Sequence, residues 1–371
     1  MVKKKISAMI MVLILLLWWC FPVSAEAGTE HTEGYYTYTV TNGDATIISV
    51  DKNISGAVTV PQSLGGYPLK AIGNSAFENC AELTAITLPA GVELVANNAF
   101  AYCENLRAAT LPNSLVTIGI NVFLNCTKLK EVSLPSVEQL SNGTFENCVS
   151  LEKCRLSPHL KKIGDGAFAY CASLKSLGFY ESLQSLGNAA FIGCKSLESI
   201  NFGYYQRIGD NCFKDCTALQ YPDLPLAFVS MGVSAFEGCT ALEQVSLDDS
   251  FLTAVPQRAF AGCTSLRFVS VPMETEFIGE EAFLGCEQLK IENENSYKIR
   301  FGTEYKLITD AEWRYANKNT YKPPADSVNP EQNEDNIDWV NVIFASVIAA
   351  LLSFSALFCI IVISIKKREH Q

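Results

Sequence analysis

The sequence is poor in histidine and in positive charge. Its 371 residues include three histidines, His31, His159 and His370, and no glycine-rich phosphate loop. Catalytic triads and catalytic zinc sites draw on histidine, so the sequence predicts no enzyme, with no catalytic residue, no metal and no cofactor. Lysine and arginine number 28 against 39 acidic residues, which gives a formal net charge of −11. Because proteins recognise nucleic acid through clustered cations, we expect no nucleic-acid partner.

Cysteine and phenylalanine, in contrast, recur with a fixed period. The segment Ala-Phe-x-x-Cys-x-x-Leu first occupies residues 76–83 and returns every 22 to 24 residues until Cys286; Cys103, for example, follows Cys80 by 23. The repeated phenylalanines are Phe77, Phe100, Phe123, Phe145, Phe168, Phe191, Phe213, Phe236, Phe260 and Phe283. The cysteines, each three residues later, are Cys80, Cys103, Cys126, Cys148, Cys171, Cys194, Cys216, Cys239, Cys263 and Cys286. Such a period indicates a solenoid, in which each repeat forms one turn buried against its neighbours.

Each repeat also contains a strand signal. The cysteine is followed by Leu-x-x-Ile-x-Leu, as in residues 83–88, and often by a proline such as Pro89. The Ile-x-Leu part has the period of a half-buried strand, and proline ends it because proline cannot donate to a ladder. A second apolar position follows, usually before glycine, as in Ile118-Gly119. We expect the Ala-Phe-x-x-Cys piece to turn the chain back as a short helical or 3₁₀ turn.

Together these motifs resemble the BspA-like leucine-rich repeats of microbial surface proteins. The Leu-x-x-Leu-x-Leu pattern is the strand of a leucine-rich repeat, but Leu-Pro, Ile-Gly and Ala-Phe-x-x-Cys replace the asparagine that usually follows it. The entry from Gly66-Tyr67-Pro68 into Ile72-Gly73 is similar to the start of that family. The resemblance covers roughly residues 34–290. It implies an α/β repeat solenoid of about ten to eleven coils with short strands, and a role in adhesion or surface recognition.

The repeated cysteines allow two interpretations. They form either a disulfide array in an oxidising compartment or a column of small buried hydrophobic side chains. Turns spaced ~4.8 Å apart bring the Cα atoms near disulfide range, but stacked side chains run parallel, whereas a disulfide needs converging Cβ atoms. We therefore favour buried free thiols. Cys154 takes a strand position that Ile86 and Val132 hold elsewhere, and Cys212 takes the alanine site held by Ala76, so both are expected in the core.

The N-terminal part of the chain differs from the array. Residues 1–25 have the basic, apolar and small-residue regions of a signal peptide, with an uncleaved anchor as the alternative. We expect residues 26–75 to form an N-terminal cap and first coil, with a hairpin turn at Asn42-Gly43. Residues 76–290 form the solenoid, and residues 291–321 a C-terminal cap that includes a last strand around residues 297–301.

The C-terminal part predicts a membrane anchor. Residues 322–338 are rich in proline, asparagine and acid, as in a flexible stalk. Residues 339–365, from Trp339 to Ile365, carry no charge and are long enough for one transmembrane helix in contact with lipid. The basic tail, residues 366–371, would stay in the cytoplasm, leaving the N-terminal domain extracellular on the cell membrane. The nearest match to a Gram-positive sorting signal, residues 329–333, has glutamine in place of the cleaved threonine, which disfavours wall attachment.

The exposed strand positions are the first candidate ligand-binding residues. The position before the last apolar residue of each strand is occupied by Thr87, Thr110, Ser133, Arg155, Gly178, Asn201, Asp223, Ser246 and Ser270. Stacked in register, they would form a polar surface of the kind on which solenoids bind extended partners, or else a plain solvated sheet. From this row we select Arg155, Asn201 and Asp223.

Aromatic residues supply the second set of candidates. Phe179-Tyr180 replace Leu-Pro in one coil, Tyr204 and Tyr205 follow in the next, and Tyr221 lies on the strand after that. These tyrosines either form an exposed binding patch, since tyrosine is enriched at interfaces, or fill the space that the prolines cover elsewhere.

These observations favour a cell-surface adhesion or binding protein with an extracellular protein or carbohydrate ligand. The alternative is a structural or accessory subunit that docks another membrane protein. An enzyme is the third possibility, and it lacks a visible site.

Overall fold

The computed structural model describes residues 28–134, 136–201, 207–224, 229–247, 250–272, 275–292, 298–301, 304–307 and 313–314. The chain divides into two compact units, Met1–Lys322 and Pro323–Gln371, and the second lies entirely outside the described residues. The predicted signal peptide, stalk, transmembrane helix and cytoplasmic tail likewise lie outside them. Within the described residues, no helix is long and apolar enough to cross a membrane.

The chain begins with an antiparallel sheet. Strands β1 (Glu30–Glu33), β2 (Tyr36–Thr41) and β3 (Asp44–Val50) pair in that order, and Asn42-Gly43 turns the β2–β3 hairpin with φ angles of 53° and 86°. Such positive φ angles are those that a two-residue hairpin turn requires, so the predicted hairpin is confirmed. Strands β5 (Ser63–Leu64) and β6 (Tyr67–Ile72) form a second, short hairpin, and β3 pairs with β6 in parallel.

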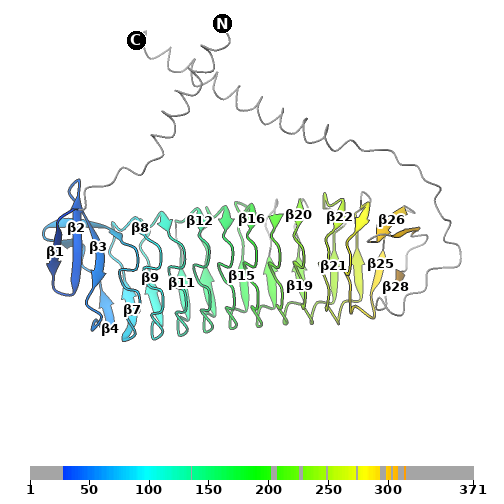
Figure 1. Ribbon diagram of the computed structural model, residues 1–371, viewed down its shortest axis with the longest axis horizontal. Helices are drawn as coiled ribbons and strands as arrows, with labels where there is room; N and C mark the ends of the chain where they lie inside the picture. Colours follow the sequence, from blue (N-terminus) through cyan, green and yellow to red (C-terminus); the bar gives the residue numbers. More distant parts are fainter. Residues whose placement is uncertain are drawn as a thin grey trace, which may run out of the picture. The chain divides into compact units, whose positions relative to one another are not determined.

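From here the chain winds into a β-solenoid with two strands per turn (Figure 1). The first ladder runs through β4 (Gly56–Thr59), β7 (Leu83–Thr87), β9 (Ala108–Thr110), β11 (Glu131–Ser133), β13 (Lys153–Arg155), β15 (Ser176–Gly178), β17 (Ser199–Asn201), β19 (Tyr221–Asp223), β21 (Gln244–Ser246), β23 (Phe268–Ser270) and β25 (Lys290–Glu292). These are the Ile-x-Leu strands expected from the sequence. Their pairing is parallel, with breaks between β13 and β15 and between β19 and β21.

The second ladder, which the sequence pattern did not predict as strands, contains the Ile-Gly positions. After β3 and β6 it runs through β8 (Leu94–Val95), β10 (Thr117–Ile118), β12 (Gln139–Leu140), β14 (Lys162–Ile163), β16 (Ser185–Leu186), β18 (Arg207–Ile208), β20 (Ser230–Met231), β22 (Ala254–Val255), β24 (Phe277–Ile278) and β26 (Lys298–Phe301). The second residue of the two-residue strands is buried, as Ile118 is. Gly119 then approaches the previous turn so closely that a Cβ there would lie 2.6 Å from the Asn97 nitrogen.

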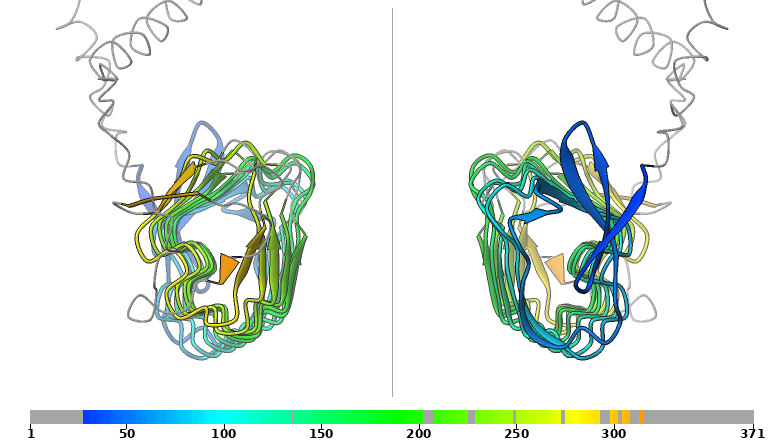
Figure 2. Two further views of the ribbon diagram at one scale, coloured as in Figure 1. Left: turned by 90° about the vertical axis from the view of Figure 1, so that its right-hand side faces the viewer. Right: turned by 90° about the vertical axis from the view of Figure 1, so that its left-hand side faces the viewer.

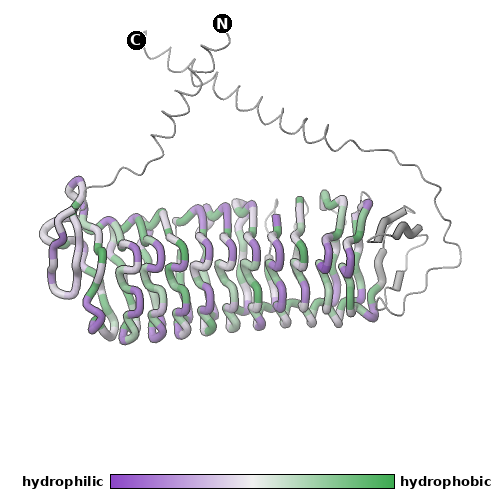
Figure 3. Tube along the Cα trace, viewed as in Figure 1, coloured by the Kyte–Doolittle hydropathy of each residue, from purple (hydrophilic) through white to green (hydrophobic). Residues whose placement is uncertain are grey.

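At the C-terminal end the pairing becomes antiparallel again. β26, which confirms the predicted last strand, pairs with β27 (Glu304–Leu307), and β25 pairs with β28 (Trp313–Arg314). Viewed along the solenoid axis, successive turns superpose on one another (Figure 2). Hydrophilic and hydrophobic segments recur at the same places from turn to turn (Figure 3).

The Ala-Phe-x-x-Cys piece is not helical, so that expectation and the α half of the predicted α/β class find no support. No helix occurs among the described residues. Left-handed backbone positions flank each phenylalanine two residues before and after; around Phe100 they are Asn98 and Tyr102, with φ of 57° and 60°. Backbone N–H groups alternate: those of Asn98, Phe100 and Tyr102 donate to the next turn, whereas that of Cys103 donates to Phe100 in its own turn. Alternation of this kind prevents a continuous helical ladder.

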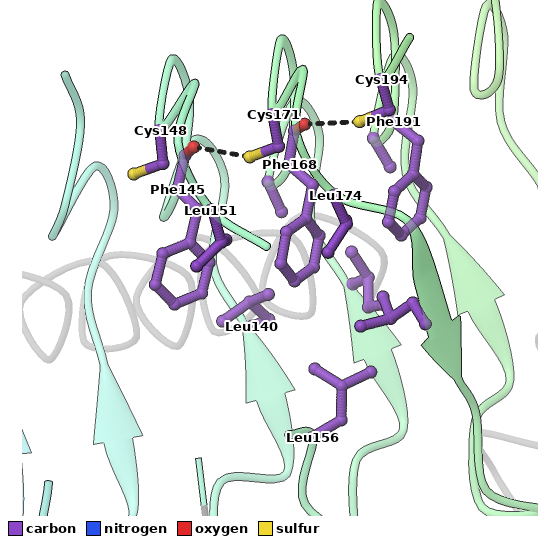
Figure 4. Packing of buried hydrophobic residues seen from close by; sticks show 14 of the residues in the cluster. Leu140, Phe145, Cys148, Leu151, Leu156, Phe168, Cys171, Leu174, Phe191 and Cys194 are labelled. Carbon is purple, nitrogen blue, oxygen red and sulfur yellow. Dashed lines mark hydrogen bonds between the residues drawn. The ribbon is translucent and has the colours of Figure 1, made fainter. Parts of the chain in front are cut away.

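The phenylalanines form the axis of the core. All ten are buried, with at most 1% of their surface exposed, and they stack in nine consecutive pairs with ring centroids 5.0–5.5 Å apart. The array from Phe77 to Phe283 therefore spans about nine full turns between its first and last ring. Leucines and the second-ladder residues pack around the rings (Figure 4).

Each repeat cysteine after the first links two turns. Its thiol donates a hydrogen bond to the phenylalanine carbonyl of the turn before, as Cys171 does to Phe145 across 3.2 Å and Cys194 to Phe168 across 3.1 Å (Figure 4). The same bond, at 3.1–3.2 Å, is made by Cys103, Cys126, Cys148, Cys216, Cys239, Cys263 and Cys286. All twelve described cysteines are free thiols, in agreement with the buried-thiol interpretation.

Candidate ligand-binding face

The outward side of the first ladder, which we call the outer face, is built by strict alternation in its strands. Ile86 and Val132 point into the core and are buried, whereas their neighbours Thr87 and Ser133 lie on the outside. The parallel register then brings equivalent side chains of successive turns side by side; Thr87, for example, pairs with Thr110. The sequence repeat thus produces a regular row of mostly short polar side chains.

The three selected row residues occupy equivalent positions on three strands of this face. Arg155 pairs with Ser133 and is exposed. Asn201 pairs with Gly178 on one side and with Asp223 on the other. At the C-terminal end the row becomes less accessible, because Ser270 is buried and donates a hydrogen bond to the Ser246 hydroxyl across 3.3 Å. The backbone register therefore places the row positions side by side, and among those whose side chains the structure describes, Ser270 is the buried one.

The aromatic candidates are distributed differently. Phe179 takes the core position of the usual leucine, with its ring 6.1 Å from that of Phe191, so this aromatic belongs to the core packing and not to an exposed patch. Tyr180 takes the proline position and is 46% exposed. Tyr221, which is 48% exposed, begins β19 and donates a hydrogen bond to the Glu243 carboxylate across 2.9 Å. Tyr204 and Tyr205 lie outside the described residues.

The structure does not bring Tyr180 and Tyr221 together. Tyr221 is in register with Ser199, which is in register with Ser176, and Tyr180 follows Ser176 by four residues. The two exposed tyrosines therefore lie two strands apart and at opposite ends of their strands. The described residues form a polar face with separated tyrosines, and they do not form a continuous aromatic patch.

Most of the cysteine column offers little nucleophilic chemistry; the exception is its first member, Cys80, whose pKa is lowered chiefly by a hydrogen bond with Cys103. Burial raises the pKa of the Cys126, Cys194 and Cys286 thiols to about 12, and that of Cys148 and Cys171 well above its ordinary value. The thiolate is the reactive form of cysteine, and at neutral pH this burial disfavours it.

The two cysteines outside the repeat column also behave as core residues. Cys212 is completely buried, and Cys154 is partly buried and packs against the core cluster. Burial raises the pKa of both thiols. Among the described residues, no group of three or more His, Cys, Asp or Glu side chains is arranged to hold a metal ion.

The comparison with protein families settles the identity of the repeat. The model of the "BspA type Leucine rich repeat region" matches residues 66–175 and 161–290, with six copies, and these two ranges together cover more than half of the chain. The chain belongs to this family. The resemblance drawn from Leu-Pro, Ile-Gly and Ala-Phe-x-x-Cys is thereby confirmed. No curated protein matches the chain significantly.

Several solved structures are similar to this BspA-type chain. A leucine-rich cell surface protein from Faecalibacterium prausnitzii is 23% identical, with 73% of this chain and 90% of that chain covered and a TM-score of 0.44. A leucine-rich repeat protein from Bacteroides ovatus is 20% identical, with coverages of 74% and 100% and a TM-score of 0.39. The pneumococcal vaccine antigen PcpA is 16% identical, with coverages of 75% and 99% and a TM-score of 0.34.

Two features that hold the turns in register were not predicted from the sequence. The first, which we call the Asx ladder, consists of Asn or Asp three residues before the repeat phenylalanine. Each side-chain oxygen accepts a backbone N–H from the next turn, at 2.8–3.1 Å. The members are Asn74, Asn97, Asn142, Asp165, Asn188 and Asp210. The recurrence of Asn or Asp three residues before the phenylalanine is the sequence pattern from which the ladder could have been predicted.

The second is a set of ion pairs between neighbouring turns. On the second ladder, Lys70 pairs with Glu93 at 2.6 Å and Lys161 with Glu138 at 2.8 Å. In the turns beside the phenylalanine column, Arg258 contacts both Glu237 and Glu281, and Glu237 also contacts Lys214. Opposite charges separated by one repeat length were visible in the sequence for most of these pairs.

Proposed function

We propose that this BspA-type protein is a cell-surface binding or adhesion protein that presents the outer face of its first ladder to an extracellular protein or carbohydrate ligand. The observation that carries the proposal is the outer face itself. Where the structure describes its side chains, they are mostly short and polar, at one per turn, and they lie above the buried core residues of the same strands. Regular exposed sheets of this kind allow a solenoid to bind an extended ligand along its axis.

The display of the array on the cell surface is part of the same proposal. It rests on the signal-peptide pattern of residues 1–25 and on the uncharged segment from Trp339 to Ile365. Protease treatment of intact cells tests it: the proposal predicts loss of the solenoid and protection of a C-terminal tag. Recovery of the intact chain in the soluble cell fraction would contradict it.

Binding is tested with the full-length chain against a panel of matrix proteins and glycans. The variant Arg155→Ala/Tyr221→Ala removes two exposed side chains from the outer face. The matched control, Tyr102→Asn/Tyr170→Asn, changes two exposed tyrosines in the phenylalanine turns, at a position where Asn125 is the residue of another repeat. We expect the first variant to bind its ligand more weakly and the control to bind like the unaltered protein. Equal binding by all three proteins would exclude the outer face as the site.

A further inference from the structure

One part of the outer face has a charge opposite to that of the whole chain. Five cationic side chains, all exposed, lie on or directly before four successive first-ladder strands, β9, β11, β13 and β15. They are Arg107, Lys130, Lys153, Arg155 and Lys175, and we call them the basic strip. The carboxylates among them are Glu131 and Glu152, so five positive charges minus two negative ones leave three positive charges. The chain as a whole carries −11.

Backbone pairing places the strip residues on neighbouring turns. The N–H of Lys130 donates to the Arg107 carbonyl across 3.1 Å, and the N–H of Lys153 donates to the Lys130 carbonyl across 3.2 Å. Strands in a ladder lie ~4.8 Å apart, and side chains on one face of a strand repeat after ~6.6 Å. Across β9 to β15, three strand spacings therefore extend the strip for roughly 14 Å along the solenoid axis.

The charges of the strip are not used inside the protein. On the second ladder and beside the phenylalanine column, Lys70, Lys161, Lys214 and Arg258 all form ion pairs with glutamates of neighbouring turns. Among the described residues, none of the five strip cations makes such a pair. Glu131 is in direct register with Lys153 and still makes no ion pair with it. These cations therefore remain available to a partner.

The surroundings of the strip favour a hydrated partner over a folded protein. Protein interfaces are centred on buried aromatic or large apolar side chains. No exposed large hydrophobic residue lies in the described strands β9, β11, β13 or β15. The small strip neighbours are Thr110, Ser133, Ser176 and Gly178. Hydroxyl groups and cations can bind sugar hydroxyls and anionic groups without an apolar centre.

We propose that the basic strip binds a linear anionic polysaccharide, bearing sulfate or uronate groups, along the solenoid axis. Lysine and arginine form charge-assisted hydrogen bonds with such groups, and arginine binds them in a bidentate way. The inference rests on the proposed surface-binding function and specifies its ligand class. Because the strip is exposed, its affinity decreases as salt concentration rises.

The test uses the full-length chain with heparin and polygalacturonate as probes. Neutral dextran, polyglutamate and double-stranded DNA serve as comparison polymers. The strip variant is Lys130→Gln/Lys153→Gln/Arg155→Gln. The control variant, Lys162→Gln/Lys195→Gln/Arg207→Gln, removes the same number of exposed cations from outside the outer face. We expect binding to heparin or polygalacturonate that weakens about tenfold or more in the strip variant and changes less than about twofold in the control, with unchanged melting temperatures.

Several results would overturn the proposal. Equal weakening in both variants would show a general charge effect, and unchanged binding in the strip variant would place the site elsewhere. Binding to polyglutamate or DNA as tight as to the polysaccharides would remove the saccharide assignment. If the panel finds a protein ligand and no anionic glycan, this inference fails while the proposed surface-binding function stands. If nothing in the panel binds, both fail.

Discussion

The thiol of Cys171 donates a hydrogen bond to the carbonyl oxygen of Phe145, one turn earlier, across 3.2 Å. That same oxygen also accepts the backbone N–H of Cys148 across 3.0 Å. Each repeat cysteine after the first thus fills a small buried site and adds a link to a carbonyl that already has a donor. The motif contributes core packing and hydrogen bonds between turns. Its effect on ligand binding is indirect, because it keeps the strands of the outer face in register.

Because the Phe145 carbonyl accepts two hydrogen bonds, we expect removal of the Cys171 thiol to lower the stability of the fold only slightly. Cys171→Ala leaves the Phe145 carbonyl with the Cys148 N–H as partner, so only one weak hydrogen bond and a small volume are lost. We expect a destabilisation of about 1–2 kcal/mol, measured by denaturant unfolding. Ligand binding by the folded variant should be unchanged. A loss of binding at full foldedness would assign the cysteine column a role beyond packing.

Removing a ring from the phenylalanine column should have a much larger effect. Phe168 stacks between Phe145 and Phe191, with centroid distances of 5.3 and 5.2 Å. Phe168→Ala leaves a cavity in the middle of the array and should cost about 3–5 kcal/mol. The matched control is Phe251→Ala, because Phe251 is 69% exposed and exposed substitutions usually stay within about 0.5 kcal/mol. Similar melting temperatures for the two variants would contradict the stacked core.

The Asx ladder predicts that the stability of the fold depends on the side-chain oxygen at these positions and not on its charge. The Oδ1 atom of Asn97 accepts the backbone N–H of Ile120 across 2.8 Å. Asn97→Ala removes this acceptor and should cost about 1 kcal/mol. Asn97→Asp keeps the oxygen, as Asp165 and Asp210 do at equivalent positions, and should be nearly neutral. Thermal unfolding of the two variants at neutral pH separates these outcomes, and equal losses would argue against the ladder.

The ion-pair cluster around Glu237 predicts acid sensitivity. The Arg258 guanidinium holds the pKa of Glu237 down, to about 2, against burial, with further hydrogen bonds from Ser234 and Lys214. A carboxyl whose folded pKa is depressed stabilises the protein above its unfolded pKa, 4.5, and loses that contribution as pH falls toward the folded value. Since Arg258 is 34% exposed, solvent screening reduces the contribution, and we expect about 1–3 kcal/mol.

Glu237→Gln tests this contribution. The variant should be less stable than the unaltered protein at pH 6, and the difference should shrink between about pH 4.5 and pH 2. Glu104→Gln, at an exposed position, is the control and should leave the pH profile in place. A constant difference between Glu237→Gln and the unaltered protein across this range would mean that titration of Glu237 is not involved.

Much of the fold could be predicted from the sequence, because the residues that form it recur at the same position in each repeat. The buried phenylalanine and cysteine columns, the Ile-x-Leu strands and the Asn42-Gly43 hairpin were predictable because each rests on a local signal that returns in the same place. The expected helical turn does not form because residues such as Asn98 and Tyr102 adopt left-handed backbone angles. Asparagine favours such angles only moderately and tyrosine does not, so these repeats gave a weaker signal than glycine would have given.

Other features depended on contacts between turns that a single repeat does not show. The second ladder has strands of only two residues, such as Thr117–Ile118, too short for alternation to be recognised. For the candidate site, the row containing Arg155 followed from the period alone. The separation of Tyr180 from Tyr221 did not, because it depends on register and on where each tyrosine lies along its strand.

The repeated Ala-Phe-x-x-Cys-x-x-Leu segment is a packing device built on buried thiols. The most direct test is mass-spectrometric mapping of cysteine alkylation in the natively purified chain, before and after denaturation without reductant. We expect the repeat cysteines from Cys103 to Cys286 to resist alkylation in the folded protein and all to become alkylated as free thiols once it is unfolded. Recovery of most of these cysteines in disulfides after unfolding would contradict it.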